Sequence, residues 1–188
     1  MASIRTFIAI ETPSDIRAKI ISLQRTLKQI DADVRWESED TLHTTIKFLG
    51  DVNENILPTL VSLIEPIAQN QSPCTIIIEK SGCFPNTHQP RVIWVGCTNP
   101  DNKLTAIKKM IDTALQPHGF EIEQRAFTPH ITLGRVKGTK NLSHLISSME
   151  KLTFEPQQYT VHEVVLMKSV LRLEGSEYSV LKKFQLQL

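Results

Sequence analysis

The order of predicted strands and helices in the first half of the chain is repeated in the second half. Runs of β-branched and apolar residues predict strands, whereas apolar residues three and four positions apart predict amphipathic helices. In the first half these patterns predict a strand, a helix, two strands, a helix and a strand, over residues 4–10, 14–30, 34–36, 42–49, 56–67 and 75–79. The same order follows over residues 91–97, 99–115, 120–124, 129–136, 141–149 and 159–168. This pattern restricts the chain to an internally duplicated fold.

Corresponding positions in the two halves lie close to 87 residues apart. His43 corresponds in this way to His130, and Cys74 corresponds to Val161. The β-α-β-β-α-β unit forms a sheet with helices on one side. We therefore predict a bilobal α/β (α+β) fold in which two such units face each other across a pseudo-two-fold axis. Mostly antiparallel sheets would line a central cleft, with the helices outside.

We predict a single domain over residues 1–188. Its repeat halves span approximately residues 1–87 and 88–174. Residues 171–188 form an additional strand or hairpin, and the pattern does not specify which sheet receives it.

Charge and hydropathy restrict where the protein acts and what it binds. The 21 Lys and Arg residues nearly balance the 20 Asp and Glu residues, so any contact with nucleic acid must use a local group of cations. No apolar run approaches the ~20 residues of a membrane span, and residues 1–11 do not have the pattern of a signal peptide. The three cysteines lack metal-ligand spacing and are odd in number, which favours a reducing compartment. We expect a cytoplasmic protein without membrane contact.

Two histidines occupy equivalent places in the repeat, and each is followed two residues later by a threonine. The pairs are His43 with Thr45 and His130 with Thr132. Side chains at i and i+2 of a strand lie on the same face, so each pair would share a surface. Either motif alone is compatible with an ordinary structural histidine. Their common position in the repeat favours one symmetric site between the lobes.

Two facing imidazoles are suited to acid–base chemistry at phosphorus. Because the ordinary pKa of histidine is about 6.5, one ring can be neutral and the other protonated near neutral pH. One ring can then accept a proton from a nucleophile while the other donates a proton to the leaving oxygen. Hydroxyls such as those of Thr45 and Thr132 can donate to the non-bridging oxygens. The residues alone do not decide which histidine is the acid. No carboxylate lies beside either histidine at ligand spacing, so we expect neither a metal nor another cofactor.

Arginines near the second histidine motif are candidate phosphate ligands. Arg135 follows Gly134, and its odd spacing from His130 would direct it to the opposite face of a regular strand. A bulge or turn at Gly134 could return Arg135 to the cleft, where it would bind phosphate; otherwise it is a solvated cation. Arg125, five residues before His130, is a weaker candidate for substrate binding.

Two residues after the first motif are also candidates. Phe48 could stack on a nucleobase or could pack in the core. Lys47 shares the strand face of His43 by alternation, and we expect it to be a charge on the rim of the cleft.

The sequence resembles the 2H phosphoesterase superfamily, and within it the RNA 2′,3′-cyclic phosphodiesterase group, also called 2′-5′ RNA ligase-like proteins. The resemblance covers nearly the whole chain and is carried by residues 5–11, 34–36, 42–50, 91–96 and 127–135, the last being the most specific. It implies a bilobal α/β fold and metal-independent opening of a 2′,3′-cyclic phosphate to a 2′-phosphomonoester. By analogy, His43 would donate a proton to the departing 3′ oxygen and His130 would accept one from water. Thr44 departs from the family, which usually has a hydrophobic residue there.

Other activities remain compatible with the same residues. The expected substrates are RNA ends or nucleotides that bear a 2′,3′-cyclic phosphate. The same site could join RNA ends through a 2′-5′ linkage, with a ribose hydroxyl in place of water. A third alternative is a non-catalytic protein that binds RNA ends. We expect a monomer in each case.

Overall fold

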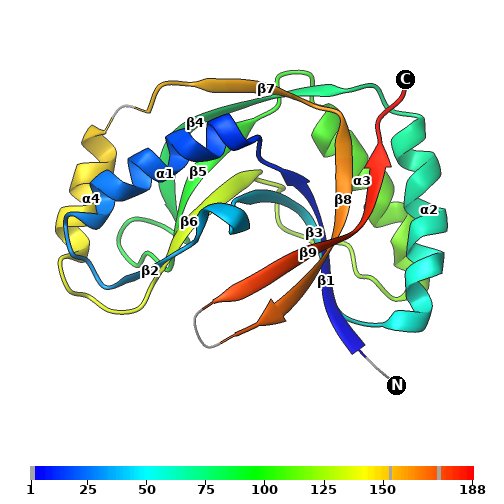
Figure 1. The fold of residues 1–188 in the computed structure, drawn as a ribbon, viewed down its shortest axis with the longest axis horizontal. Helices are drawn as coiled ribbons and strands as arrows, with labels where there is room; N and C mark the ends of the chain where they lie inside the picture. Colours follow the sequence, from blue (N-terminus) through cyan, green and yellow to red (C-terminus); the bar gives the residue numbers. More distant parts are fainter. Residues whose placement is uncertain (1–2, 153, 173–174) are drawn as a thin grey trace.

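A single curved sheet and four helices form the framework of this computed structural model (Figure 1), which describes residues 3–152, 154–172 and 175–188. The strands are β1 (Ser3–Glu11), β2 (Val34–Trp36), β3 (His43–Asn53), β4 (Cys74–Phe84), β5 (Val92–Thr98), β6 (His130–Val136), β7 (Gln157–Val161), β8 (Glu163–Leu171) and β9 (Ser176–Gln185). The helices are α1 (Ser14–Lys28), α2 (Leu57–Gln69), α3 (Lys103–Leu115) and α4 (Leu142–Lys151). Three short 3-10 helices are η1 (Glu39–Thr41), η2 (Glu54–Ile56) and η3 (Gln116–His118). The predicted α/β class is confirmed.

The sheet has two parts that meet at one narrow junction. Its strand order is β7-β4-β5-β6-β3-β1-β8-β9. Strand β2 pairs with β6 on the edge opposite β5, beyond the short β3–β6 pairing. Between β3 and β6 the only residues paired are Thr44 and Ile131. Helices α1 and α4 lie against one part, and α2 and α3 lie against the other (Figure 1). The result is two lobes that diverge from the junction, with the helices on the outer side.

The pseudo-two-fold axis passes through pairs of equivalent residues. Thr44 pairs with Ile131, and Cys74 pairs with Val161; in both pairs the partners are 87 residues apart. A residue that pairs with its own repeat equivalent in an antiparallel ladder must lie on or next to the axis that relates the repeats. Both pairs therefore reproduce the predicted repeat offset.

The two lobes are not the two halves of the sequence, which corrects the expectation that each repeat unit forms its own lobe. Strand β4 of the first half pairs with β5 of the second half, and β8 of the second half pairs with β1 of the first. The helices are exchanged in the same way, because α1 contacts α4 and α2 contacts α3. The cause is the direction of β4 and of the β7–β8 segment, each of which crosses from one lobe to the other. Nearly all the buried apolar residues form one continuous core.

Two further details differ from or complete the sequence-based expectations. Residues 120–124 form no strand, although their repeat equivalent is close to β2. The C-terminal segment joins the lobe of β1, where β9 pairs with β8; residues 173–174 between these strands lie outside the described residues. Across the described ranges, no helix combines the length and apolar character that a bilayer span requires.

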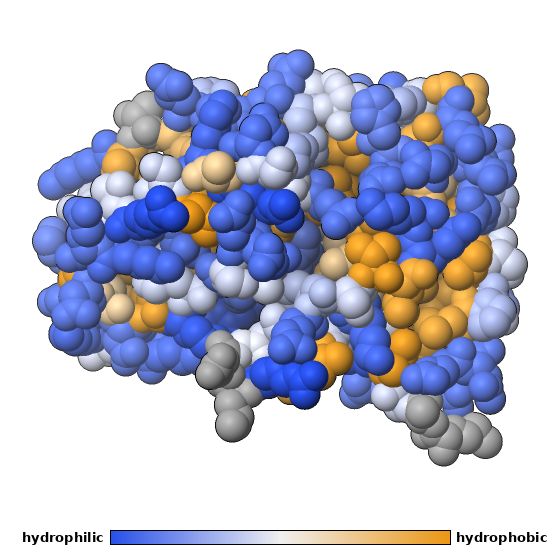
Figure 2. All heavy atoms as spheres, in the orientation of Figure 1, coloured by the Kyte–Doolittle hydropathy of each residue, from blue (hydrophilic) through white to orange (hydrophobic). Residues whose placement is uncertain are grey.

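The concave face of the β1 lobe carries a small apolar cluster of its own. Phe7, Ala9, Val165 and Met167 form it, and Tyr178 of β9 packs over it. On the molecular face shown in Figure 2, apolar side chains gather on the side of α2, whereas the side of α1 and α4 is mostly hydrophilic. The concave apolar cluster matters for the site because it contacts one of the two histidines.

Candidate active site

Both motif histidines are held by the same local hydrogen bond. His43 Nδ1 lies 2.7 Å from the carbonyl oxygen of Thr41, and His130 Nδ1 lies 2.7 Å from that of Thr128. A carbonyl can only accept, so Nδ1 carries the proton in each ring and donates it. This tautomer leaves each Nε2 as the nitrogen that can exchange a proton with a bound molecule.

The motif threonines accompany the histidines as strand alternation predicts. Thr45 and Thr132 are half-buried and share the strand faces of His43 and His130. Thr45 Oγ1 lies 3.1 Å from His43 Nε2, within hydrogen-bond distance. The Thr44–Ile131 pair lies immediately after the two histidines, so it brings the two motifs together across the lobe junction.

Aromatic packing partly shields His43 from solvent and favours its neutral form. Its ring lies 4.8 Å from that of Phe7 and 5.0 Å, edge-on, from that of Tyr178. Burial therefore lowers the pKa of His43 from 6.5 to about 4. The Thr41 carbonyl opposes this change, whereas the positive charges of His130 and Arg135 add to it.

His130 has a different aromatic environment with the same electrostatic effect. Its ring packs edge-on against Phe84 at 4.8 Å, and Trp94 lies 6.3 Å away. Burial lowers the pKa of His130; the Thr128 carbonyl opposes the shift, and the charge of Arg135 adds to it. The positive charge of Arg135 therefore acts on both histidines. An anion bound near them would favour protonation of either ring.

Equivalent bulges direct Phe48 and Arg135 toward the histidine face. The pairing of β3 with β1 omits Ile46, and the pairing of β6 with β5 omits Leu133, its equivalent 87 residues later. An extra residue reverses the alternation beyond it. Phe48 is consequently 60% exposed, and Arg135 is also exposed, whereas the residue before each is buried. The bulge that Arg135 requires is thus present, one residue before Gly134.

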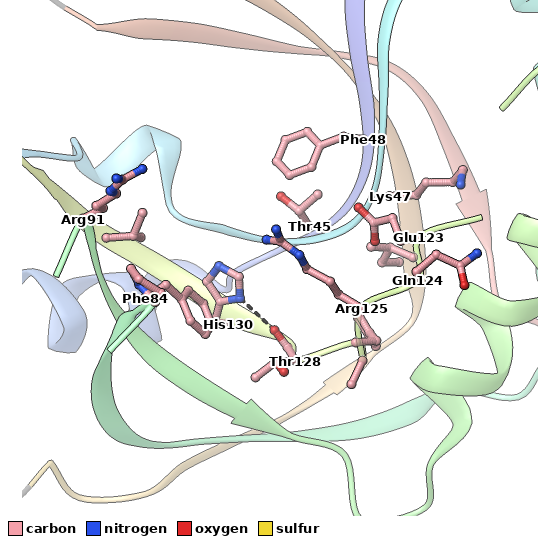
Figure 3. Close-up of a pocket in the computed structure, with 15 residues that line it drawn as sticks. Thr45, Lys47, Phe48, Phe84, Arg91, Glu123, Gln124, Arg125, Thr128 and His130 are labelled. Carbon is pink, nitrogen blue, oxygen red and sulfur yellow. Dashed lines mark hydrogen bonds between the residues drawn. The ribbon is translucent and has the colours of Figure 1, made fainter. Parts of the chain in front are cut away.

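The same bulge corrects the expectation for Lys47. This side chain is 1% exposed and points away from His130 (Figure 3), so it is not a charge on the rim. Lys47 Nζ lies 2.6 Å from Asp112 Oδ1 and donates to the carbonyl of Glu121 at 2.7 Å. Alternation alone predicted the wrong face because it assumes an uninterrupted strand register.

A buried ion cluster attaches residues 121–127 to α3. Asp112 accepts from Lys47 and, through Oδ2 at 2.7 Å, from Lys108. Lys108 also pairs with Glu123 at 3.3 Å and lies 5.7 Å above the ring of Phe127. These contacts hold the irregular segment in place of strand hydrogen bonds. Sequence patterns did not indicate the cluster, because its members come from β3, α3 and a loop.

A cavity of about 810 Å³ adjoins the second histidine. Phe48, Thr45, Arg125 and His130 are among its lining residues, and Figure 3 shows the Arg125 side chain extending between Thr45 and His130. Phe84 and Arg91 line it on the side of β5. The other predicted site residues, His43, Thr132 and Arg135, do not line this cavity. The site therefore has a histidine centre and a cavity to one side.

Several side chains around the histidines were not identified from the sequence. Phe7, Tyr178, Phe84 and Trp94 surround the rings, but single aromatic residues on apolar strands carry no distinctive spacing. Glu37, which is largely buried, lies 3.3 Å from Arg135 Nε. In the part of the chain that the structure describes, no three His, Cys, Asp or Glu side chains are grouped as metal ligands.

The duplicated fold with two equivalent His-x-Thr motifs at its centre defines the class of two-histidine phosphoesterases, and comparisons with known proteins identify the family. The model of the LigT-like phosphoesterase family matches residues 10–94 and again residues 95–175, one match in each half. The chain therefore belongs to the LigT-like phosphoesterases, a 2H phosphoesterase family, and is an enzyme of that class.

Curated relatives and solved structures agree with this assignment. The chain is 33% identical to an RNA 2′,3′-cyclic phosphodiesterase of Methanothermobacter thermautotrophicus, over 97% of this chain and 99% of the relative. It is 34% identical to a protein of the same name from Methanocaldococcus jannaschii, over 96% and 99%. The crystal structure of Escherichia coli LigT complexed with 3′-AMP superposes with a TM-score of 0.79 at 26% identity and covers 100% of both chains.

Proposed function

We propose that this protein hydrolyses 2′,3′-cyclic phosphates, on RNA ends or on nucleotides, to 2′-phosphomonoesters by general acid–base catalysis without a metal. The observation that carries the proposal is the symmetric pair of histidines. Each has its Nδ1 proton bound to a carbonyl, which leaves Nε2 as the nitrogen that exchanges a proton; Nε2 of His43 lies 3.1 Å from Thr45 Oγ1. The motifs meet at the lobe junction. The names of the relatives in two archaea support the choice of substrate.

The cyclic phosphate would bind between the two Nε2 atoms. Thr45 and Thr132 would donate hydroxyl hydrogen bonds to its non-bridging oxygens, where negative charge increases during the reaction. Arg135 would supply a permanent positive charge to the same oxygens. Its Nε already contacts Glu37, which orients the guanidinium and leaves the other two nitrogens for phosphate.

The two histidines would share one proton in the reactive state. His130 accepts a proton from the attacking water, and His43 donates a proton to the departing 3′ oxygen, as the family resemblance implies. In the free protein both pKa values are lowered, which favours neutral rings. The negative charge of the bound phosphate raises them and thereby supplies the protonated His43 that the step needs.

The cavity beside His130 would receive the nucleobase. Phe48 offers an exposed aromatic face, and Arg125 offers a planar cation that can stack or donate hydrogen bonds. These two residues therefore bind substrate without taking part in proton transfer.

The test is hydrolysis of a nucleoside 2′,3′-cyclic phosphate in EDTA, with the product isomer assigned by phosphorus NMR. We expect a 2′-phosphate and loss of turnover in His43→Ala and His130→Ala. His144→Ala on α4 is the matched control, because His144 is exposed on the outer side of the fold. Loss of activity in EDTA would refute the metal-free mechanism, and turnover in both active-site variants would refute the role of the histidines.

The same assay separates the alternative activities. An RNA with a free 5′-hydroxyl, added to the reaction, would give a 2′-5′ linked product if the protein joins ends. The cavity supports a test of end joining, because about 810 Å³ is large enough to admit a nucleoside whose hydroxyl takes the place of water. A protein that only binds RNA ends would retain affinity for the cyclic phosphate with no turnover.

The proposal also includes a monomeric cytoplasmic protein. All three cysteines are free and buried, which is compatible with a reducing compartment. Burial raises the pKa of Cys74 to about 11 and that of Cys97 to about 12, so these thiols remain protonated and unreactive. Sedimentation analysis and cell fractionation test the two statements separately.

A further inference from the structure

Two arginines lie side by side on the site face of the β2–β6 ladder. Arg35 of β2 is directly opposite Arg135 of β6, and both side chains are exposed. Residues directly opposite in a ladder point to the same face, and like charges in such positions repel each other. Arg135 has Glu37 as a partner, but within the described ranges no carboxylate lies at ion-pair distance from Arg35. The arrangement is unfavourable for the protein alone and favourable when an anion binds.

The position of Arg35 is fixed by close packing and by a buried hydrogen-bond bridge. A Cβ at Gly134 would lie 2.7 Å from Val34 Cγ1 and 3.1 Å from the carbonyl oxygen of Arg35, so β2 lies against β6 without space between them. The buried amide of Gln24 donates to the carbonyls of Glu37 and Leu133, at 2.7 and 2.9 Å. Gln24 of α1 thus links the segment after β2 to β6. The backbone that carries Arg35 and Arg135 is therefore held in place.

Arg35 lies on β2, which neighbours β6 on the edge opposite β5, at the level of Arg135 and five residues along the ladder from His130. The positive charge of Arg135 lowers the pKa of both histidines, whereas Arg35 is not among the causes of either shift. Neighbouring strands are ~4.8 Å apart, so an anion that bridges the two arginines would lie beyond the reactive phosphate. Neither arginine lines the cavity that we assign to the base. The paired arginines therefore lie outside this cavity.

We propose that Arg35, with Arg135, binds the phosphodiester on the 5′ side of the terminal nucleotide, so that the enzyme prefers an RNA end to a free nucleoside cyclic phosphate. This inference rests on the proposed function. The terminal ribose has three connections: the cyclic phosphate at the histidines, the base in the cavity, and the 5′ oxygen that continues the chain. The paired arginines are the local group of cations that a protein of net charge +1 needs to hold a polyanion.

The smallest test compares adenosine 2′,3′-cyclic phosphate with and without a 5′-phosphate. We expect the native enzyme to show a higher kcat/KM for the 5′-phosphorylated substrate, through a lower KM. Arg35→Gln should reduce this preference by about fivefold to tenfold, between the effect of an exposed ion pair and that of a charged hydrogen bond. Arg25→Gln is the matched control, because Arg25 is an exposed cation on α1 and the variant has the same net charge.

The salt dependence provides a second readout that loss of folding would not produce. With a short RNA that ends in a cyclic phosphate, Arg35→Gln should flatten the plot of log kcat/KM against log salt by about 0.7, as expected for one phosphate contact on a single strand. An unchanged preference for the 5′-phosphate, or a loss equal to that of Arg25→Gln, overturns the proposal.

Binding distinguishes failure of this inference from failure of the proposed function. Fluorescence anisotropy with an RNA that ends in a 2′-phosphate reports the Arg35 contact without catalysis. Weaker RNA binding by Arg35→Gln in a protein that hydrolyses no cyclic phosphate supports the anion site and refutes the proposed reaction. Equal RNA binding by the native protein and by Arg35→Gln overturns the anion site, even where the native protein hydrolyses the cyclic phosphate.

Discussion

Asp112 is the residue whose replacement tests most directly how the irregular segment beside the site is held. Its two carboxylate oxygens accept from Lys47 at 2.6 Å and from Lys108 at 2.7 Å, and all three side chains are at least nine-tenths buried. Asp112→Asn keeps the shape of the side chain and removes its negative charge. The two lysines would then face each other in the protein interior without the carboxylate that lies between them.

The expected loss of stability follows from the partners that remain. Removal of one member of a buried ion pair destabilises a protein by ~3–5 kcal/mol. Lys47 keeps the carbonyl of Glu121, and Lys108 keeps Glu123, so we expect the lower end of the range, about 3 kcal/mol. For a chain of this length, each kcal/mol lowers the Tm by ~2–4 °C, which gives about 6–12 °C.

Urea unfolding at equilibrium is the appropriate assay, with a shift of the midpoint at constant slope as the sign of a true stability change. Asp31→Asn is the control: Asp31 pairs with Lys140 at 2.6 Å, but these side chains are 78% and 63% exposed, and we expect a change below about 1 kcal/mol. Asp112→Asn should also raise the KM of nucleotide substrates, because the segment carries Arg125. A loss of stability no larger than that of the control would refute the reasoning.

Three further predictions concern the site and the strand beside it. In the free protein both histidine pKa values lie below 6.5, and the reaction needs one ring to be protonated. We therefore expect kcat/KM to fall about tenfold per pH unit above pH 6.5. Because bound phosphate raises the histidine pKa values, the fall in kcat should begin at a higher pH than the fall in kcat/KM. Arg135→Gln should move the kcat/KM limb to higher pH; a flat profile between pH 5 and 8 would contradict the shared-proton mechanism. Phe48→Ala should raise the KM of nucleotides by about fivefold or more through loss of stacking. Because Phe48 is 60% exposed, the free energy of unfolding should change by less than about 0.5 kcal/mol. Equal KM values for the native protein and the variant would exclude stacking. Gly134→Ala should destabilise the protein by about 1–3 kcal/mol, measured by thermal unfolding, since the new methyl would clash with β2; a neutral substitution would show that β2 is not held tightly.

The repeat and the two histidine motifs could be predicted because both depend on short-range patterns. Alternation places His43 and Thr45 on one face, and the same rule applies to His130 and Thr132, since neither pair is separated by a bulge. The offset of 87 residues needed no structural information. In the structure, Thr44 pairs with Ile131, and these two residues are separated by that offset.

The faces of Lys47 and Phe48 could not be predicted in this way. Both follow the bulge at Ile46, and a bulge arises where the register of β3 on β1 changes, a property of the strand pair. The sequence indicated that Arg135 faces the site only if β6 contains a bulge, but it did not indicate whether the bulge is present. The predicted strand at residues 120–124 was wrong because its backbone has no partner strand and is held by buried ions instead.

The sequence by itself determined the duplicated plan, the paired His-x-Thr motifs and the family to which they belong. These features are local in the chain, because they depend on residue identity and on periods of two and of three to four residues. Only the tertiary structure decided that the lobes exchange strands, that a lysine lies beneath the site, and that aromatic rings from β1 and β9 desolvate His43. Each of these depends on contacts between residues far apart in the chain, and strand alternation carries no information about which strands pair or where their register changes.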